Sequence, residues 1–307
     1  MIAGRVLVTG ANGFLGRHLV SRLRSASAEV HTVGRQPSSE VVPVECRWTA
    51  NVADEREARE VVQRVRPNVV VHLGALTHAA PDLELVLPTF HSALASTVNL
   101  LTALTEQGCR RIVLAGSIEE PVGGAEARPA SPYAAAKWAA SAYGRMFHAL
   151  YDTPVVIARL ALTYGPGQLA RKVIPSTIFA VLRGEAPQVS SGARAWDVVY
   201  VDDVIEALVR LVDGRGPDGA TVDVGSGRLT TLRSIVERVV AIVDPTITPV
   251  FGVVPDRPLT ETHAADAAAT EAMLDWRATT SLEAGLRTTV DWCRTHMNRL
   301  GRHGVAP

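Results

Sequence analysis

The stretch RVLVTGANGFLGRHL, residues 5–19, decides the fold of this chain. A short apolar run leads into a turn with three glycines, Gly10, Gly13 and Gly16, and a helix-like segment follows. A residue without a Cβ lets the backbone turn tightly and come close to a pyrophosphate, whose charge meets the free N–H groups at the start of a helix. The stretch therefore predicts a strand, a dinucleotide-binding turn and a helix.

Outward from this stretch, short runs rich in valine, isoleucine and leucine alternate with longer helix-like segments. The strand-like runs are RVLVTG, EVHTVG, NVVVHLGA, RIVLAGS, PVVIARLAL and ATVDVGSG, and the helix-like segments include residues 15–25, 55–65 and 92–106. Runs that are apolar on both faces and separated by amphipathic helices are typical of a parallel sheet covered on each side. The pattern predicts an α/β fold with a Rossmann-type doubly wound parallel sheet.

The domain organisation is predicted from the places where this alternation is interrupted. Residues 1–166 are expected to form a dinucleotide-binding Rossmann domain, to which segments near 196–226 return. Residues 167–195 and 227–307 are more irregular and richer in proline. We expect these residues to form mainly a smaller C-terminal substrate-binding lobe.

Composition limits the classes of function. The chain has 307 residues, 47% of them hydrophobic, and its 31 basic and 31 acidic residues cancel, so no overall field attracts nucleic acid or an acidic membrane surface. We see neither a leader-like start nor an apolar run as long as a membrane span. Cys46, Cys109 and Cys293 lie far apart without metal-ligand spacing. We expect a cytoplasmic protein without a nucleic-acid or membrane partner and without a metal site.

The cofactor preference depends on the end of the second predicted strand, which reads TVGRQ. An acidic residue at this place would bind the adenosine ribose 2′-hydroxyl, but Arg35 stands there, and a guanidinium suits a 2′-phosphate. The sequence therefore favours NADP(H), with NAD(H) as the alternative. The competing interpretation is that Arg35 is an ordinary exposed loop arginine.

Further landmarks follow in order along the chain. They are NVAD at 51–54, HLGALT at 72–77, a strand ending in Ser117, SPYAAAK at 131–137, RLALTYGPG from Arg159, DVVYVDDVIEAL from Asp197, VDVGSG from Val222 and LDWRATTSLEAGLRTTVDW from Leu274. With the glycine turn, they make the chain resemble the extended short-chain dehydrogenase/reductases of the NAD-dependent epimerase/dehydratase type. Within them it is similar to the branch that acts on nucleotide-activated sugars, most of all to sugar-nucleotide 4-ketoreductases.

The resemblance implies an active site, a cofactor site and an assembly. The catalytic residues would be Ser117, Tyr133 and Lys137. The cofactor would be bound by Gly10, Asn12, Gly13, Phe14, Leu15, Gly16, Arg35, Asn51, Val52, Leu73, Gly74, Ala75, Tyr133 and Lys137. Apolar and small residues after Ala93 and in WAASAYGRMFHALY would build the two-fold four-helix interface of a homodimer.

The chemistry of the implied triad is consistent with its residue types. Tyr133 and Lys137, four residues apart, share one helix face, and a nearby ammonium is expected to lower the pKa of a tyrosine by favouring its phenolate. Tyr133 would exchange a proton with a sugar oxygen while hydride moves to or from nicotinamide, and Ser117 would hydrogen-bond the same oxygen. Taken without the rest of the chain, most pairs of this kind are two solvated helix side chains.

Several positions depart from the family pattern. Sugar 4,6-dehydratases usually carry an acid directly after the hydroxyl residue, but Ile118 stands there, followed by Glu119 and Glu120. This weakens dehydration, although Glu119 keeps it open; the alternative is that both glutamates form a solvated loop pair. Leu162, Trp196 and Ala93 replace an asparagine, an arginine and a second asparagine that are common in the family. The remaining substrate-binding candidates are Thr77, Ser117, Glu119, Arg171, Arg194 and Arg257.

The leading functional prediction is an enzyme of deoxysugar biosynthesis. It would reduce a nucleotide-linked 4-keto-6-deoxyhexose to the 4-hydroxy sugar with NADP(H). The alternatives are a nucleotide-sugar 4-epimerase or 4,6-dehydratase with tightly held NAD(P), a reductase of a non-sugar carbonyl, and a non-catalytic dinucleotide-binding regulator. Retention of the cofactor separates the first two, because an epimerase keeps its dinucleotide through the cycle and a reductase exchanges it.

Overall fold

The centre of the computed structural model is a parallel sheet, and the residues described are 4–36, 43–123, 126–256 and 262–300. Within them, seven strands lie in the order β3-β2-β1-β4-β5-β6-β10, all parallel. Their bounds are β1 Arg5–Thr9, β2 Glu29–Gly34, β3 Arg47–Thr49, β4 Val69–His72, β5 Arg111–Ser117, β6 Val155–Leu160 and β10 Thr221–Val224. The chain starts in the middle of the sheet, winds to one edge and then returns to wind the other way. The predicted doubly wound Rossmann-type fold is confirmed.

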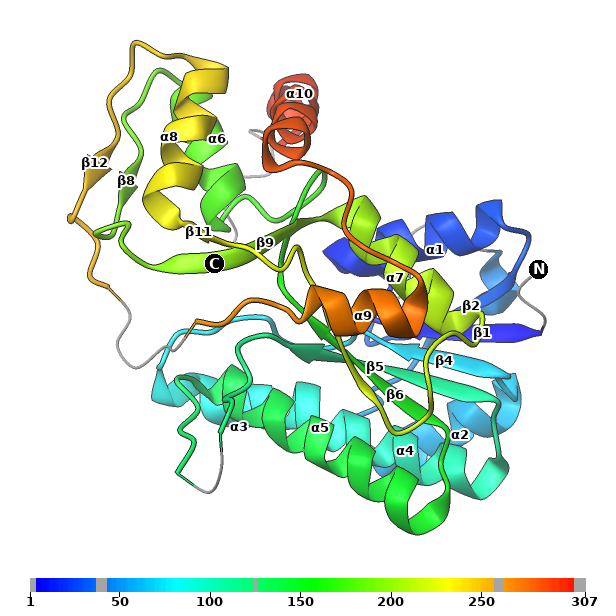
Figure 1. Ribbon diagram of the computed structural model, residues 1–307. Coiled ribbons are helices and arrows are strands. Elements are labelled where there is room, and N and C mark those ends of the chain that lie inside the picture. Colours follow the sequence, from blue (N-terminus) through cyan, green and yellow to red (C-terminus); the bar gives the residue numbers. More distant parts are fainter. Residues whose placement is uncertain (1–3, 37–42, 124–125, 257–261, 301–307) are drawn as a thin grey trace.

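Helices cover both faces of this sheet (Figure 1). One face carries α1 (Phe14–Ser25) and α7 (Val201–Val212), and the other carries α2 (Glu55–Val65), α4 (Ser96–Gln107) and α5 (Pro132–Tyr151). Successive residues of β5 supply the two cores, since Val113 packs in the cluster of α1 and α7 whereas Ile112 and Leu114 pack in the cluster of α2, α4 and α5. A strand apolar on both faces is therefore buried on both faces.

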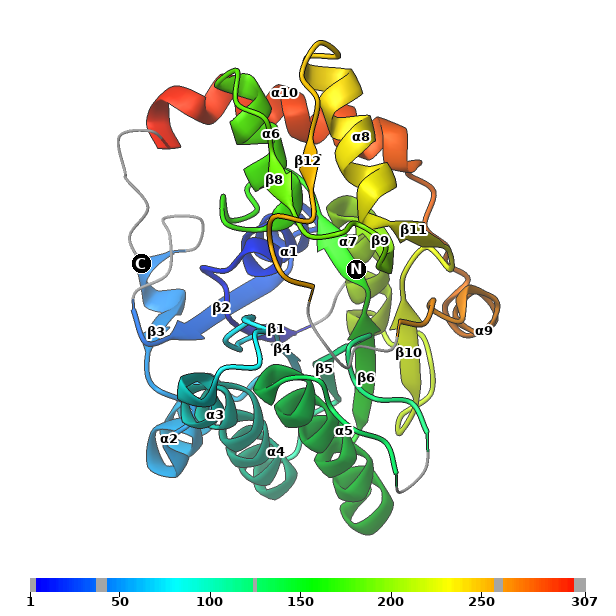
Figure 2. The ribbon, with the colours of Figure 1, turned by 90° about the vertical axis from the view of Figure 1, so that its left-hand side faces the viewer.

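Most of the remaining elements gather beyond the sheet (Figure 2), whereas α9 (Ala267–Leu274) packs on β10 and α7. Helices α6, α8 and α10 pack on one another. The bounds are β7 Leu162–Tyr164, α6 Val173–Leu182, β8 Gln188–Val189, β9 Ala195–Tyr200, β11 Leu229–Thr231, α8 Leu232–Val243, β12 Val250–Phe251, α9 Ala267–Leu274 and α10 Leu282–Leu300. Ile178 of α6 and Leu286 of α10 belong to the same buried cluster as Val6 of β1. The predicted domain bounds stay a prediction, because this core runs without interruption into the sheet.

A tie between β9 and two loops fixes how these elements meet. The Asp197 carboxylate is 1% exposed. It accepts hydrogen bonds from the backbone N–H groups of Ser226 (2.8 Å), Gly227 (2.9 Å) and Ala265 (2.9 Å) and from the Ser226 hydroxyl (2.7 Å). A buried carboxylate with this many donors joins the loop after β10 and the chain before α9 to the single side chain of Asp197.

The helix predicted over residues 92–106 is longer and less regular than its sequence suggests. A short turn, η1 (Val44–Cys46), precedes β3, and another, η2 (Leu83–Leu85), precedes α3 (Val86–Thr89). Helix α3 then runs through a π-helical segment, η3 (Phe90–Ala95), into α4. By length and composition the stretch Leu83–Gln107 is apolar enough to cross a membrane. Its C-terminal part, α4, packs on α2 and α5, whereas Leu83, Leu87 and Phe90 near its start are exposed.

Candidate active site

The sheet brings most of the predicted site residues to one edge. The glycine turn follows β1, Arg35 follows β2, Leu73, Gly74 and Ala75 follow β4, and Ser117 is the last residue of β5. Because these strands are parallel, their carboxyl ends lie at the same edge, which is where ligands bind in open α/β sheets. Segments more than 100 residues apart in sequence thereby form one site.

The glycine turn has the geometry of an anion cradle. Gly10 has φ of +70°, and a Cβ added to it would lie 2.8 Å from Gly74 N. A Cβ on Gly16 would collide with Gly10 O and lie 2.6 Å from the Cα of Ala11. Among the described residues, no side chain caps α1 at Gly13 and its first turn carries no acidic residue, so the helix N-terminus is suited to a pyrophosphate. These residues fit a bound dinucleotide.

A chain of buried hydrogen bonds holds the second wall of this cradle. Gly74 N–H donates to the Thr9 hydroxyl (2.9 Å), which contacts His72 Nδ1 (2.7 Å), and His72 Nε2 contacts the Ser96 hydroxyl (3.2 Å). Burial, and next the charge of Lys137, lower the pKa of His72 to about 3. A neutral imidazole can accept from Thr9 and donate to Ser96, so His72 links the end of β1 to α4.

Tyr133, Lys137 and Ser117 come together between α5 and β5. The Ser131 side chain accepts from Ala134 N (3.1 Å) and so starts α5 directly before Tyr133. The Ser117 side chain lowers the pKa of Tyr133, so the two hydroxyl groups lie near one another. Lys137 is 5% exposed, and its Nζ donates to the Ala115 carbonyl (2.7 Å). Three groups that only the resemblance assigned to one site therefore lie within one site.

The expected tuning of the tyrosine is wrong. Burial raises the pKa of Tyr133, the charges of Glu119 and Glu120 raise it further, and the Ser117 side chain lowers it. Burial also lowers the pKa of Lys137 to about 8, against a raising effect of Glu120. Burial and the two glutamate charges therefore favour the protonated phenol in this state.

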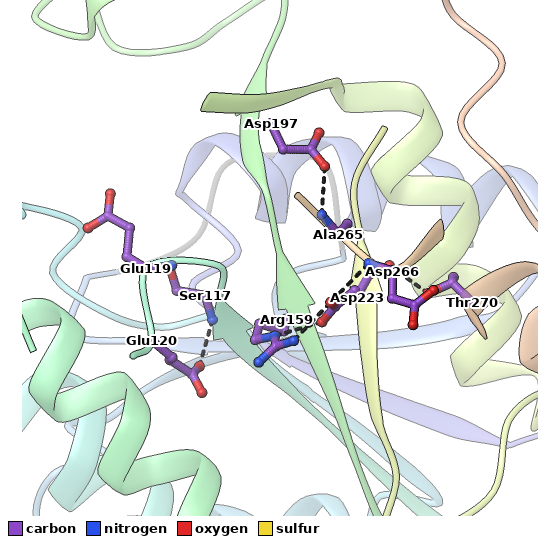
Figure 3. A network of polar contacts seen from close by, with 9 residues as sticks. All are labelled: Ser117, Glu119, Glu120, Arg159, Asp197, Asp223, Ala265, Asp266 and Thr270. Carbon is purple, nitrogen blue, oxygen red and sulfur yellow. Dashed lines mark hydrogen bonds and ion pairs between the residues drawn. The ribbon is translucent and has the colours of Figure 1, made fainter. Parts of the chain in front are cut away.

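The two glutamates after Ser117 have different surroundings (Figure 3). Glu120 is 4% exposed, and its Oε1 accepts from Ser117 N (2.7 Å). The interpretation of both residues as a solvated pair is therefore wrong for Glu120. Glu119 is half-buried, its N–H donates to the Ser117 hydroxyl (3.2 Å), and its carboxylate points away from that of Glu120 (Figure 3).

Behind Ser117, Figure 3 shows a polar network that sequence reasoning missed. Arg159 of β6 donates from Nε (2.6 Å) and Nη2 (2.8 Å) to the Asp223 carboxylate of β10. Asp223 also accepts from Asp266 N (3.1 Å), and its carbonyl accepts from Thr270 (2.7 Å). The only sequence signal is that Arg159 opens a family landmark, because residues 64 apart show no local pattern.

The predicted substrate-binding residues other than Ser117 and Glu119 have separate surroundings. Arg194 is half-buried and its guanidinium lies 4.0 Å from the centre of the Trp196 ring, so the departure at Trp196 supplies a platform for a neighbouring arginine. Arg171 is exposed, and the Thr77 carbonyl accepts from Lys172 Nζ (2.7 Å). Arg257 lies outside the described residues. The predicted substrate roles of these residues stay predictions.

The outer cofactor candidates lie at the surface. Asn12, Arg35 and Asn51 are exposed, and Phe14, Leu15 and Val52 are half-buried. Asn51 N–H donates to Glu57 Oε2 (2.7 Å), and the Val52 carbonyl accepts from Asn99 (3.3 Å). These contacts fix the loop after β3 on α2 and α4 and leave its predicted cofactor role as a prediction.

Comparison with known proteins places this site in a family. The model of the NAD dependent epimerase/dehydratase family matches residues 6–225. The chain belongs to this family. The dTDP-glucose 4,6-dehydratase of Mycobacterium tuberculosis is 31% identical over 94% of this chain and 93% of its own length. The predicted relationship to extended short-chain dehydrogenase/reductases that act on nucleotide sugars is confirmed.

Two solved structures extend the likeness to the whole fold. UDP-glucose 4-epimerase of Thermotoga maritima, solved with UDP-glucose, has a TM-score of 0.86 at 25% identity and covers 95% of this chain and 99% of its own. UDP-glucose 4-epimerase of Thermus thermophilus, solved with NAD, has a TM-score of 0.83 at 27% identity and covers 94% of this chain and 99% of its own. These NAD dependent epimerase/dehydratase relatives are dehydratases and epimerases, so the predicted ketoreductase activity and NADP(H) preference stay predictions.

Proposed function

We propose that this protein is a nucleotide-sugar 4-epimerase that keeps its nicotinamide dinucleotide through the reaction cycle. The observation that carries the proposal is the paired hydroxyls of Ser117 and Tyr133 beside buried Lys137, with Ile118 next in the chain. Ile118 is 7% exposed and has no proton to give. Epimerisation oxidises and re-reduces one carbon and needs only one group that exchanges a proton, here Tyr133, whereas dehydration needs a further acid to expel water.

Each residue then has a definite task. The Ser117 hydroxyl orients the sugar oxygen that reacts, and Tyr133 takes its proton in one direction and returns it in the other. Lys137 contributes positive charge near the phenol and is held by the Ala115 carbonyl (2.7 Å). When bound in the cradle of Gly10, Gly16 and Gly74, the nicotinamide dinucleotide supplies the acceptor and donor of hydride.

A 4,6-dehydratase is the second candidate, because curated relatives with this activity cover nearly the whole chain. Glu119 is the residue that would serve it, since it is half-buried and its N–H already binds the Ser117 hydroxyl. Reduction of a 4-keto-6-deoxyhexose by NADP(H) is the third, and it is favoured by Arg35 at the end of β2. All three share the oxidation–reduction chemistry at the sugar C4.

One experiment separates the three. The purified protein is denatured and its released dinucleotide is quantified, and the native protein is then incubated with UDP-glucose and with dTDP-glucose. We expect about one dinucleotide per chain and a C4-inverted sugar by proton NMR. A 4-keto-6-deoxy product would replace the proposal with dehydration. Protein free of dinucleotide that oxidises NADPH with a 4-keto sugar would replace it with reduction.

We further propose that the protein is a cytoplasmic homodimer. Its three cysteines, Cys46, Cys109 and Cys293, are all free thiols, as in a reducing compartment. Large apolar side chains are exposed on α5 and on the neighbouring segment η2–α3, which contact one another. A second copy with the same face would cover both.

A further inference from the structure

Glu120 is a buried carboxylate that the proposed reaction does not use. Its Oε1 accepts from Ser117 N (2.7 Å), and its own N–H donates to the Ser117 carbonyl (3.0 Å). Burial raises the pKa of Glu120, and the Ser117 N–H and Ser141 on α5 lower it. A Cβ on Gly116 would lie 2.7 Å from Oε1, so the absence of a side chain at Gly116 leaves room for the Glu120 carboxylate. Glu120 therefore clamps the backbone of Ser117 from both sides.

The charges around Glu120 come from several elements. Lys137 on α5 and Arg159 on β6 lower the pKa of Glu120, and Lys137 also lowers the pKa of His72 on β4. The cavity of about 370 Å³ that Glu120 lines also contains Arg145, Asp223 and Asp266. Arg159 already has the Asp223 carboxylate as a bidentate partner. Lys137 is bound to a neutral carbonyl, so Glu120 is the acidic group that acts on its ammonium.

We propose that Glu120 is a positioning residue that holds the Ser117 backbone against α5 and supplies the counter-charge of Lys137. The proposal rests on the Ser117–Tyr133–Lys137 site of the proposed function. Glu120 raises the pKa of Lys137 while burial lowers it to about 8. Without the carboxylate, the lysine charge would be lost closer to neutral pH, and the site would lose its cation in the range where an enzyme works.

The lysine content of the chain allows a direct test, because Lys137 and Lys172 are its two lysines. Protein labelled with carbon-13 at lysine Cε gives two lysine signals, and Lys172→Arg assigns them. In Glu120→Gln, which keeps an oxygen for Ser117 N–H but removes the charge, the Lys137 midpoint should fall by about one pH unit or more. The Lys172 signal of the same sample should not move.

A matched control is Glu126→Gln, because Glu126 is an exposed carboxylate in the loop that follows Glu120. It should leave both lysine midpoints unchanged. An unchanged Lys137 midpoint in Glu120→Gln would overturn the proposal. If Glu120→Gln does not fold, Glu120→Asp is the second test, because it keeps the negative charge. The Lys137 midpoint of Glu120→Asp should stay within a few tenths of a pH unit of the wild-type value. A drop as large as that expected of Glu120→Gln would overturn the proposal.

The pH profile of turnover tests the same charge during catalysis. In Glu120→Gln the alkaline fall of kcat should move to lower pH by the same amount as the Lys137 midpoint, whereas a purely structural defect would lower kcat equally at all pH values. The NMR titration needs no substrate. A shifted Lys137 midpoint in a protein that converts no nucleotide sugar would therefore refute the proposed function and leave the role of Glu120 intact.

Discussion

Replacing Tyr133 with phenylalanine separates the chemistry of the site from its folding. The ring is half-buried and keeps its packing, and the variant loses only the phenolic oxygen that interacts with the Ser117 side chain. The Ser117 hydroxyl still binds Glu119 N–H (3.2 Å), so no partner is left without a hydrogen bond. One such bond contributes about 0.5–1.5 kcal/mol, which bounds the loss of unfolding free energy.

The loss of turnover should be much larger. A positioned acid–base group contributes about 10²–10⁴ in rate, which corresponds to about 3–5 kcal/mol of transition-state stabilisation. No other hydroxyl takes over easily, because Ile118 is apolar and, in the proposed mechanism, Ser117 orients the same oxygen. Turnover should therefore fall far beyond what the stability change explains.

The assay is single-turnover cofactor reduction by stopped flow, with protein carrying oxidised dinucleotide mixed with nucleotide sugar, beside urea unfolding. Tyr143→Phe is the matched control, because Tyr143 lies on the same helix and is 41% exposed. It should reduce cofactor at the wild-type rate. Near-normal reduction in Tyr133→Phe would refute the assignment of the catalytic site.

Four further outcomes are expected. Lys137→Met should turn over far more slowly yet resist more urea at pH 7. Burial lowers the pKa of Lys137 from 10.5 to about 8, so the charged lysine makes the folded protein less stable below pH 8. Between pH 8 and 10.5 the unfolded chain keeps a proton that the folded protein has lost, so wild-type stability rises with pH and the advantage of Lys137→Met should shrink. Arg35→Asp should weaken NADP(H) relative to NAD(H) by about tenfold or more in cofactor titrations, since a charge-assisted hydrogen bond is worth about 1.5–3 kcal/mol; an unchanged ratio would make Arg35 an ordinary loop residue. Asp197→Asn places an amide against the N–H groups of Gly227 and Ala265 and should lower the unfolding free energy by about 2–4 kcal/mol, measured by urea titration. Leu87→Glu charges a side chain that is 65% exposed and should convert a dimer to a monomer in light scattering, whereas a wild-type monomer at micromolar concentration would exclude the dimer.

The sequence predicted those features that depend on residues near one another in the chain. The spacing of Gly10, Gly13 and Gly16 predicted the turn, because a close backbone approach needs residues without Cβ at those positions. Alternating apolar runs predicted the parallel sheet, and the four-residue spacing of Tyr133 and Lys137 placed both on one helix face. The family landmarks carried the assignment of Ser117, which no local pattern supplies.

Tertiary structure decided the features that depend on what surrounds a side chain. Glu119 and Glu120 are neighbours in sequence, yet Glu120 is 4% exposed under Ser117 while Glu119 points away, because successive residues of a turn face different sides. The ion pair of Arg159 with Asp223 joins strands brought together by the sheet order. The pKa of Tyr133 is raised first by burial and next by the charge of Glu119. Desolvation is a property of the assembled fold, and a sequence shows which charges are near in the chain but not which of them have lost water.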